Sequence, residues 1–215
     1  MKKDRPICNY FCISPNLLHE SKLIDKKTHD DILKDKQCFN KRFNERFTFQ
    51  VFLSCSDEFN FDLEWKLNDK DPPDIVAKIQ KYSLGFELTE LVDGDSIKKS
   101  IKEDNNEYFR LWTEEEFIRK LTELSYRKDK KMEKISKLYF LKILLIYTDE
   151  GFFETDFKSE LGMCLANENF NNLDSIKLMF SYSPDMKKCE IINLFGNSKY
   201  YNFINKIKGS VTQSV

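Results

Sequence analysis

The segment that most constrains this chain is the apolar stretch from Leu138 to Tyr147, which is interrupted only by Lys142. A membrane-spanning helix needs roughly 20 apolar residues, so this stretch is too short to cross a bilayer and we expect no membrane span. Its pattern favours an apolar strand from Tyr139 to Thr148. The N-terminus also lacks the apolar core of a signal peptide, so we expect a cytoplasmic protein with reduced cysteines.

Other segments show the alternation of apolar and polar residues, or the short apolar runs, that are typical of strands. These predicted strands span residues 47–53, 59–65, 75–79, 84–91, 175–182 and 189–195. Only a few residues connect 75–79 to 84–91, which favours a hairpin.

Helical patterns lie between the predicted strands. Apolar residues recur at helical spacing in residues 14–46, and residues 152–165 have a similar pattern. Thr113 followed by Glu116 matches a capping box, which predicts a long helix that continues to about Lys137. The order of helix, strands, helix, strand, helix and strands predicts a single α/β domain with a mixed central β-sheet flanked by helices. The length of 215 residues suits one such domain.

Two carboxylates are expected to meet in the predicted hairpin. Asp74 stands at the head of one strand, directly after Asp71-Pro72-Pro73, and Glu87 lies inside the other strand. A carboxylate among apolar strand residues is costly to bury unless a cation pairs with it. Mg²⁺ prefers such hard oxygen ligands and can also bind a phosphate oxygen. The alternative is that Asp74 is a turn residue and Glu87 faces water.

Two lysines interrupt the apolar face of the helix predicted over residues 113–137. At about 100° per residue, Lys128 and Lys131 fall among the apolar positions of this helix. A buried ammonium group needs a counter-charge, and the acidic residues of the sheet would supply it. The alternative is that both lysines extend into water from the end of the helix.

Pro73-Asp74 followed by Glu87-Leu88-Thr89 resembles the PD-(D/E)XK phosphodiesterase superfamily, which has the restriction-endonuclease-like fold. The core of that fold is a helix, a three-stranded meander, a helix and a strand, corresponding here to residues 14–147. Residues 150–208 are then an extension of the sheet with further helix. The resemblance implies that Asp74, Glu87 and the main-chain carbonyl of Leu88 bind Mg²⁺ or Mn²⁺.

The resemblance also implies roles for four other residues. The family has a lysine where this chain has Thr89, and Thr89 would instead bond a metal-bound water or a phosphate. Branches of the superfamily with this pattern supply the lysine from the following helix, so Lys128 or Lys131 would orient the attacking water or stabilise the developing charge. Glu20 would be the carboxylate that a core helix adds to the site.

The function implied by the resemblance is a metal-dependent nuclease that hydrolyses phosphodiester bonds of nucleic acid, in a defence, restriction or mobile-element context. DNA is favoured over RNA as the partner, and a homodimer is allowed. The net charge of -1 hides two separated regions: residues 119–142 have nine basic and three acidic residues, and residues 57–74 have seven acidic and two basic ones. A basic helix beside a metal site would attract a phosphate backbone.

Loss of the family lysine at Thr89 leaves a second interpretation open. In that interpretation the chain is a catalytically inactive nuclease-fold module that binds nucleic acid or a protein partner. A third interpretation is a structural or interaction protein without such a site.

Overall fold

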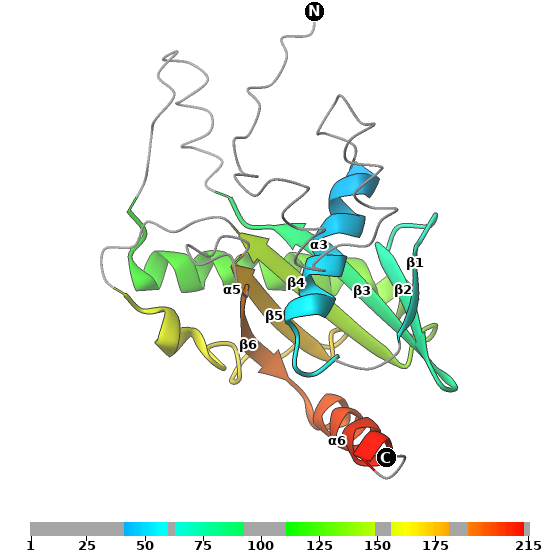
Figure 1. Ribbon diagram of the computed structural model, residues 1–215. Helices are drawn as coiled ribbons and strands as arrows, with labels where there is room; N and C mark the ends of the chain where they lie inside the picture. The colour runs from blue at the N-terminus through cyan, green and yellow to red at the C-terminus, as the bar shows by residue number, and fades with distance from the viewer. Residues whose placement is uncertain (1–40, 60–62, 93–110, 149–155, 181–188, 213–215) are drawn as a thin grey trace, which may run out of the picture.

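The computed structural model describes residues 41–59, 63–92, 111–148, 156–180 and 189–212. Within these ranges, six strands form one sheet in the order β1-β2-β3-β4-β5-β6, and three α-helices pack on it (Figure 1). The strands are β1 (Glu64–Leu67), β2 (Ile75–Ile79), β3 (Tyr82–Glu90), β4 (Leu141–Thr148), β5 (Ser175–Phe180) and β6 (Glu190–Gly196). The helices are α3 (Lys41–Cys55), α5 (Glu114–Met132) and α6 (Ser198–Thr212).

The sheet contains both parallel and antiparallel neighbours. Strands β1, β2 and β3 form an antiparallel meander, β4 is parallel to both β3 and β5, and β6 is antiparallel to β5. Parallel neighbours require a crossover connection, and α5 lies in the crossover from β3 to β4. The predicted α/β class, with a mixed central sheet flanked by helices, is therefore confirmed. Among the described helices, none has the length and apolar character needed to cross a membrane.

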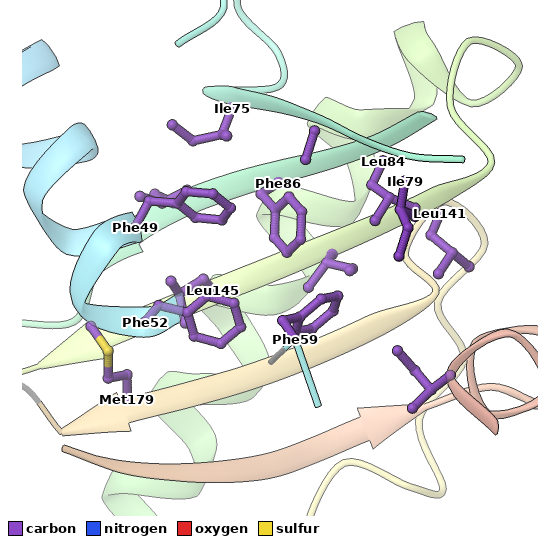
Figure 2. Close-up of a cluster of buried hydrophobic side chains, with 14 of the residues drawn as sticks. Phe49, Phe52, Phe59, Ile75, Ile79, Leu84, Phe86, Leu141, Leu145 and Met179 are labelled. Atoms are coloured by element: carbon purple, nitrogen blue, oxygen red, sulfur yellow. The ribbon is translucent and has the colours of Figure 1, made fainter. Parts of the chain in front are cut away.

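One face of the sheet packs against α3 and α6. Figure 2 shows Phe49 and Phe52 of α3 directed toward Phe86 of β3, and the ring centroids of Phe49 and Phe86 are 4.8 Å apart. From α6, Phe203 and Ile204 are buried in the same layer. Large aromatic side chains thus fill the space between these helices and the sheet.

The opposite face packs against α5 and a 3-10 turn at Lys158–Leu161. Phe117 and Leu121 of α5 are fully buried there, together with Leu144 of β4. The next residue of β4, Leu145, is equally buried but belongs to the layer on the other face. A strand covered on both faces has no exposed side, which explains why β4 is almost continuously apolar.

The prediction of a strand over residues 47–53 was wrong, because α3 covers this segment. Phe47, Phe49 and Val51 alternate as they would in a strand, and all three are buried. Phe52 is also fully buried, and in a strand it would face away from Phe49. Only a helix places residues three apart on one side, so Phe49 and Phe52 reach the same layer.

The helix predicted over residues 152–165 was also wrong within the described residues. Residues 156–165 contain a 3-10 helix at Lys158–Leu161, which ends before Gly162 and is followed by turns rather than by an α-helix. Met163 then has φ of 60°, in the left-handed region that a continuing right-handed helix excludes. The helix predicted over residues 14–46 lies largely outside the described residues.

Candidate metal site

The loop between β1 and β2 places Asp74 against β3. The main-chain N–H of Asn68 donates to the carbonyl of Asp74 at 2.8 Å, and the side-chain amide of Asn68 donates to the carbonyl of Pro73 at 2.9 Å. The Asp74 carboxylate in turn accepts a hydrogen bond at 2.8 Å from the main-chain N–H of Leu88 in β3. Asp74 is 5% exposed, so its carboxylate is fixed in a largely dry position.

Gly85 in β3 allows this loop to approach the strand closely. A Cβ atom at Gly85 would lie 3.1 Å from Cγ of Pro73 and 3.2 Å from Cγ of Tyr139. These distances are shorter than ordinary van der Waals contacts, so a larger residue would push the loop away from β3. The absence of a side chain at Gly85 therefore helps to position Asp74.

Glu87 lies in β3 and is fully buried. Its neighbours Phe86 and Leu88 belong to the layer that α3 and α6 cover, so Glu87 faces α5 instead. Its Oε1 atom accepts hydrogen bonds from Nζ of Lys128 at 2.7 Å and from Nζ of Lys131 at 2.6 Å. Both lysines that helical spacing placed on the apolar face of α5 thus contact the strand carboxylate.

The second carboxylate oxygen of Glu87 is in a different situation. Oε2 of Glu87 is buried and has no hydrogen-bond partner among the described residues. A buried acceptor that makes no hydrogen bond loses its hydration without compensation. This oxygen is consequently available for a ligand.

Asp71 is the third carboxylate of the site, and the sequence interpretation did not assign it. Nζ of Lys131 donates to Oδ1 of Asp71 at 2.5 Å, and the Asp71 side chain is 55% exposed. One carboxylate oxygen from each of Asp71, Asp74 and Glu87 lies within 4.8 Å of the other two. The signal that could have found Asp71 is its place in the same Asp-Pro-Pro-Asp loop as Asp74.

Within this group of five side chains, three carboxylates lie beside two ammonium groups, so the formal charge of the five side chains is -1. Burial alone would lower the pKa of Lys131, but its hydrogen bonds to Asp71 and Glu87 outweigh this effect and raise the pKa above its usual value. Lys131 therefore carries its positive charge at neutral pH.

The remaining predicted site residues are Leu88, Thr89 and Glu20. The carbonyl of Leu88, a predicted metal ligand, is 3.4 Å from Nζ of Lys128. Thr89 is half-buried two residues after Glu87 in β3, which places it on the same face of the sheet. Glu20 lies outside the described residues. The structure thus brings Asp74 and Glu87 together with both lysines, and it adds Asp71.

This donor set fits a hard divalent cation. Carboxylate oxygens are the ligands that Mg²⁺ and Mn²⁺ prefer, and the buried Oε2 of Glu87 is an acceptor that a cation would satisfy. Asp74 and Asp71 would complete the protein ligands, and exposure at Asp71 leaves access from solvent. A cation bound there would supply a concentrated positive charge able to attract a phosphate oxygen.

Comparisons with known proteins do not identify a family for this chain. No family model matches the chain, and no curated protein matches it either. Among solved structures, the chain is similar to a protein of unknown function from Pseudomonas aeruginosa strain PAO1 that is described as belonging to the monooxygenase superfamily. The two are 15% identical, the match covers 89% of this chain and 92% of the other, and the TM-score is 0.43.

This comparison corrects the predicted function. The neighbour's description names a monooxygenase superfamily and no nuclease, and it points away from a nuclease that cleaves phosphodiester bonds, so the predicted function was wrong. At a TM-score of 0.43 the likeness transfers no chemistry from the neighbour to this chain.

Proposed function

We propose that this protein binds a divalent cation, Mg²⁺ or Mn²⁺, at Asp71, Asp74 and Glu87, and through it a phosphate group of a nucleic acid. The observation that carries the proposal is Oε2 of Glu87, a buried carboxylate oxygen without a hydrogen-bond partner among the described residues. Leaving such an oxygen unsatisfied costs free energy, and a cation shared with two neighbouring carboxylates removes that cost.

The basic residues of α5 support a phosphate ligand. Lys128 and Lys131 both lie beside the three carboxylates, so a cation and two ammonium groups together present a local excess of positive charge. The surrounding stretch from residue 119 to residue 142 is also strongly basic. A phosphate backbone is attracted to such a surface largely without regard to base sequence, and DNA is the favoured partner.

The order of elements supports a site of PD-(D/E)XK architecture. Helix α3, the β1–β2–β3 meander, α5 and β4 follow one another in the order that this superfamily has. In this proposal Asp74, just before β2, and Glu87, in β3, would correspond to the two acidic positions of the superfamily, and α5 carries the lysines. This order of elements supports the position of a cation site and does not imply that the protein cleaves a phosphodiester bond.

Isothermal titration calorimetry with Mn²⁺ and Mg²⁺ tests the cation site directly. We expect the wild type to bind one cation. Loss of a residue that only hydrogen-bonds a metal ligand lowers metal affinity by roughly 10–100-fold, so loss of the ligand itself in Glu87→Gln should weaken cation binding by more than this. Asp71→Asn should weaken it as well, and the exposure of Asp71 means that this variant does not disturb the core.

Glu90→Gln is the matched control, because Glu90 lies on the same strand but is exposed. It should bind the cation like the wild type. Fluorescence anisotropy with labelled DNA and RNA duplexes then tests the phosphate ligand: binding should require Mg²⁺ and weaken with rising salt. Undiminished cation binding by both Glu87→Gln and Asp71→Asn, or equal DNA binding in EDTA, would contradict the proposal.

A further inference from the structure

The ammonium group of Lys131 lies between two of the three carboxylates. Its Nζ atom is 2.5 Å from Oδ1 of Asp71 and 2.6 Å from Oε1 of Glu87. A divalent metal ion bound at the same place would also bridge these two carboxylates. Lys131 therefore contacts two of the three carboxylates that a metal ion would also use.

Lys128 differs from Lys131 in its contacts and exposure. Nζ of Lys128 donates to Glu87 at 2.7 Å and lies 3.4 Å from the carbonyl of Leu88, whereas the structure gives it no bond to Asp71. Its side chain is 16% exposed, against 29% for Lys131. Lys128 is thus anchored in the interior, and Lys131 is the lysine with solvent beside it into which it can move.

We propose that Lys131 is an internal counter-ion that a divalent cation displaces from Asp71 when it binds, while Lys128 stays on Glu87. This inference rests on the proposed function and adds its regulation. Displacement follows because a divalent ion and an ammonium group that share the oxygens of Asp71 repel each other at short distance. The displaced ammonium group then becomes available to an anionic ligand, so cation loading and phosphate binding are coupled through one side chain.

The displacement predicts that removing the charge of Lys131 strengthens Mg²⁺ binding. Lys131→Met keeps an unbranched side chain but removes the competing ammonium group, so Mg²⁺ should bind about 3- to 10-fold more tightly than to the wild type. In the presence of saturating Mg²⁺, the same variant should bind a DNA duplex more weakly, because the released charge is missing. A residue with a merely structural role would not change the two affinities in opposite directions.

A double-mutant cycle separates displacement from a general charge effect, with Lys128→Met as the matched variant on the same helix. Mg²⁺ affinity is measured for each lysine variant, alone and combined with Asp71→Asn. If Lys131 competes for Asp71, the gain from Lys131→Met shrinks when Asp71 is neutralised, whereas any effect of Lys128→Met is the same in both backgrounds. Lys134→Met, at an exposed position, should change nothing.

Each outcome of this experiment either supports or overturns the displacement of Lys131. Unchanged or weaker Mg²⁺ binding by Lys131→Met, or equal gains with and without Asp71→Asn, would overturn the displacement while leaving the cation site intact. Binding of Mg²⁺ by Lys131→Met but not by the wild type would overturn both proposals, because Lys131 would then exclude the cation instead of giving way to it. Absence of Mg²⁺ binding in every variant would overturn the proposed function, and the displacement with it.

Discussion

At the scale of single residues, buried lysines in this protein are compensated by carboxylates that the chain supplies from distant positions. Lys177 in β5 is 1% exposed and pairs with Glu58, which follows α3. Burial lowers the pKa of Lys177, and the charge of Glu58 opposes that shift. The hydroxyl of Tyr200 in α6 donates to Glu58 at 2.6 Å and completes a polar cluster inside the layer formed by α3 and α6. Unlike the site at Glu87, where one carboxylate pairs with two lysines, this cluster contains a single ion pair.

The ion pair of Glu58 predicts a dependence of stability on pH. Burial alone would raise the pKa of Glu58, but the charge of Lys177 and the hydrogen bonds of Lys177, Tyr200 and Asn193 hold it below its usual value. A carboxylate of this kind stabilises the fold above its unfolded pKa of about 4.3, and this contribution is lost as pH falls through the lower folded pKa. Glu58→Gln should therefore cost about 3 kcal/mol at pH 7 and much less in acid.

Urea denaturation of the wild type and Glu58→Gln from pH 7 down to pH 3 measures this difference. Glu64→Gln serves as the control, since Glu64 is exposed on β1. Its difference from the wild type should stay small throughout. A penalty for Glu58→Gln that is the same at pH 7 and pH 3 would mean that the charge of Glu58 does not stabilise the fold.

At the scale of elements, α5 matters because it carries both lysines of the candidate site. Its first turn has the N-cap that the sequence predicts: the Thr113 side chain accepts a hydrogen bond at 3.2 Å from the main-chain N–H of Glu116. Removing this acceptor leaves a helix N–H group unsatisfied. Thr113→Ala should therefore lower the free energy of unfolding by about 1 kcal/mol, as measured by urea denaturation.

Thr122→Ala is the matched control for this prediction. Thr122 lies inside α5, where its hydroxyl bonds the carbonyl of Ile118 four residues earlier at 2.9 Å. Alanine has a higher helix propensity than threonine, so the same substitution there should be neutral or stabilising. An equal loss of stability at both positions would show that the cap has no special role.

Local signals explain which elements could be predicted from the sequence. The N-cap at Thr113 and the hairpin of β2 and β3 depend on neighbouring residues, and both are present. Helix α3 was mistaken for a strand because Phe47, Phe49 and Val51 recur at every second residue, which is the period of a strand. Packing against the sheet, which buries Phe49 and Phe52 in one layer, requires a helix instead. In the candidate site, Glu87 followed from strand alternation and Asp74 from its place at the head of a strand, whereas Asp71 lies in a loop without periodicity and is brought in by the fold.

At the scale of the whole molecule, one sheet separates two apolar layers, and β4 takes part in both. Leu144 contributes to the layer under α5 and Leu145 to the layer under α3 and α6, and both are fully buried. Neither layer can lose its packing on β4 without exposing the other face of the same strand. We therefore expect the two layers to unfold together.

The two tryptophans of the chain allow this expectation to be measured, because each reports on a different layer. Trp65 packs beside Phe49 with ring centroids 5.1 Å apart, and Trp112 is 3% exposed beside Phe117 on the other side of the sheet. In Trp65→Phe and Trp112→Phe, the fluorescence of the remaining tryptophan follows one layer during urea unfolding. For each variant, this fluorescence midpoint should coincide with the midpoint from far-ultraviolet circular dichroism of the same variant.

Leu144→Ala and Leu145→Ala extend the test to the energetics of the shared strand. Each removes a fully buried side chain from one layer only, and each should cost about 3 kcal/mol. If the sheet couples the two layers, Leu144→Ala lowers the urea midpoint reported by Trp65 as much as that reported by Trp112, and Leu145→Ala does the same. A shift confined to the tryptophan of the mutated layer would mean that the layers unfold separately. The candidate site would then depend on the α5 layer alone, because Lys128 and Lys131 reach Glu87 from that side.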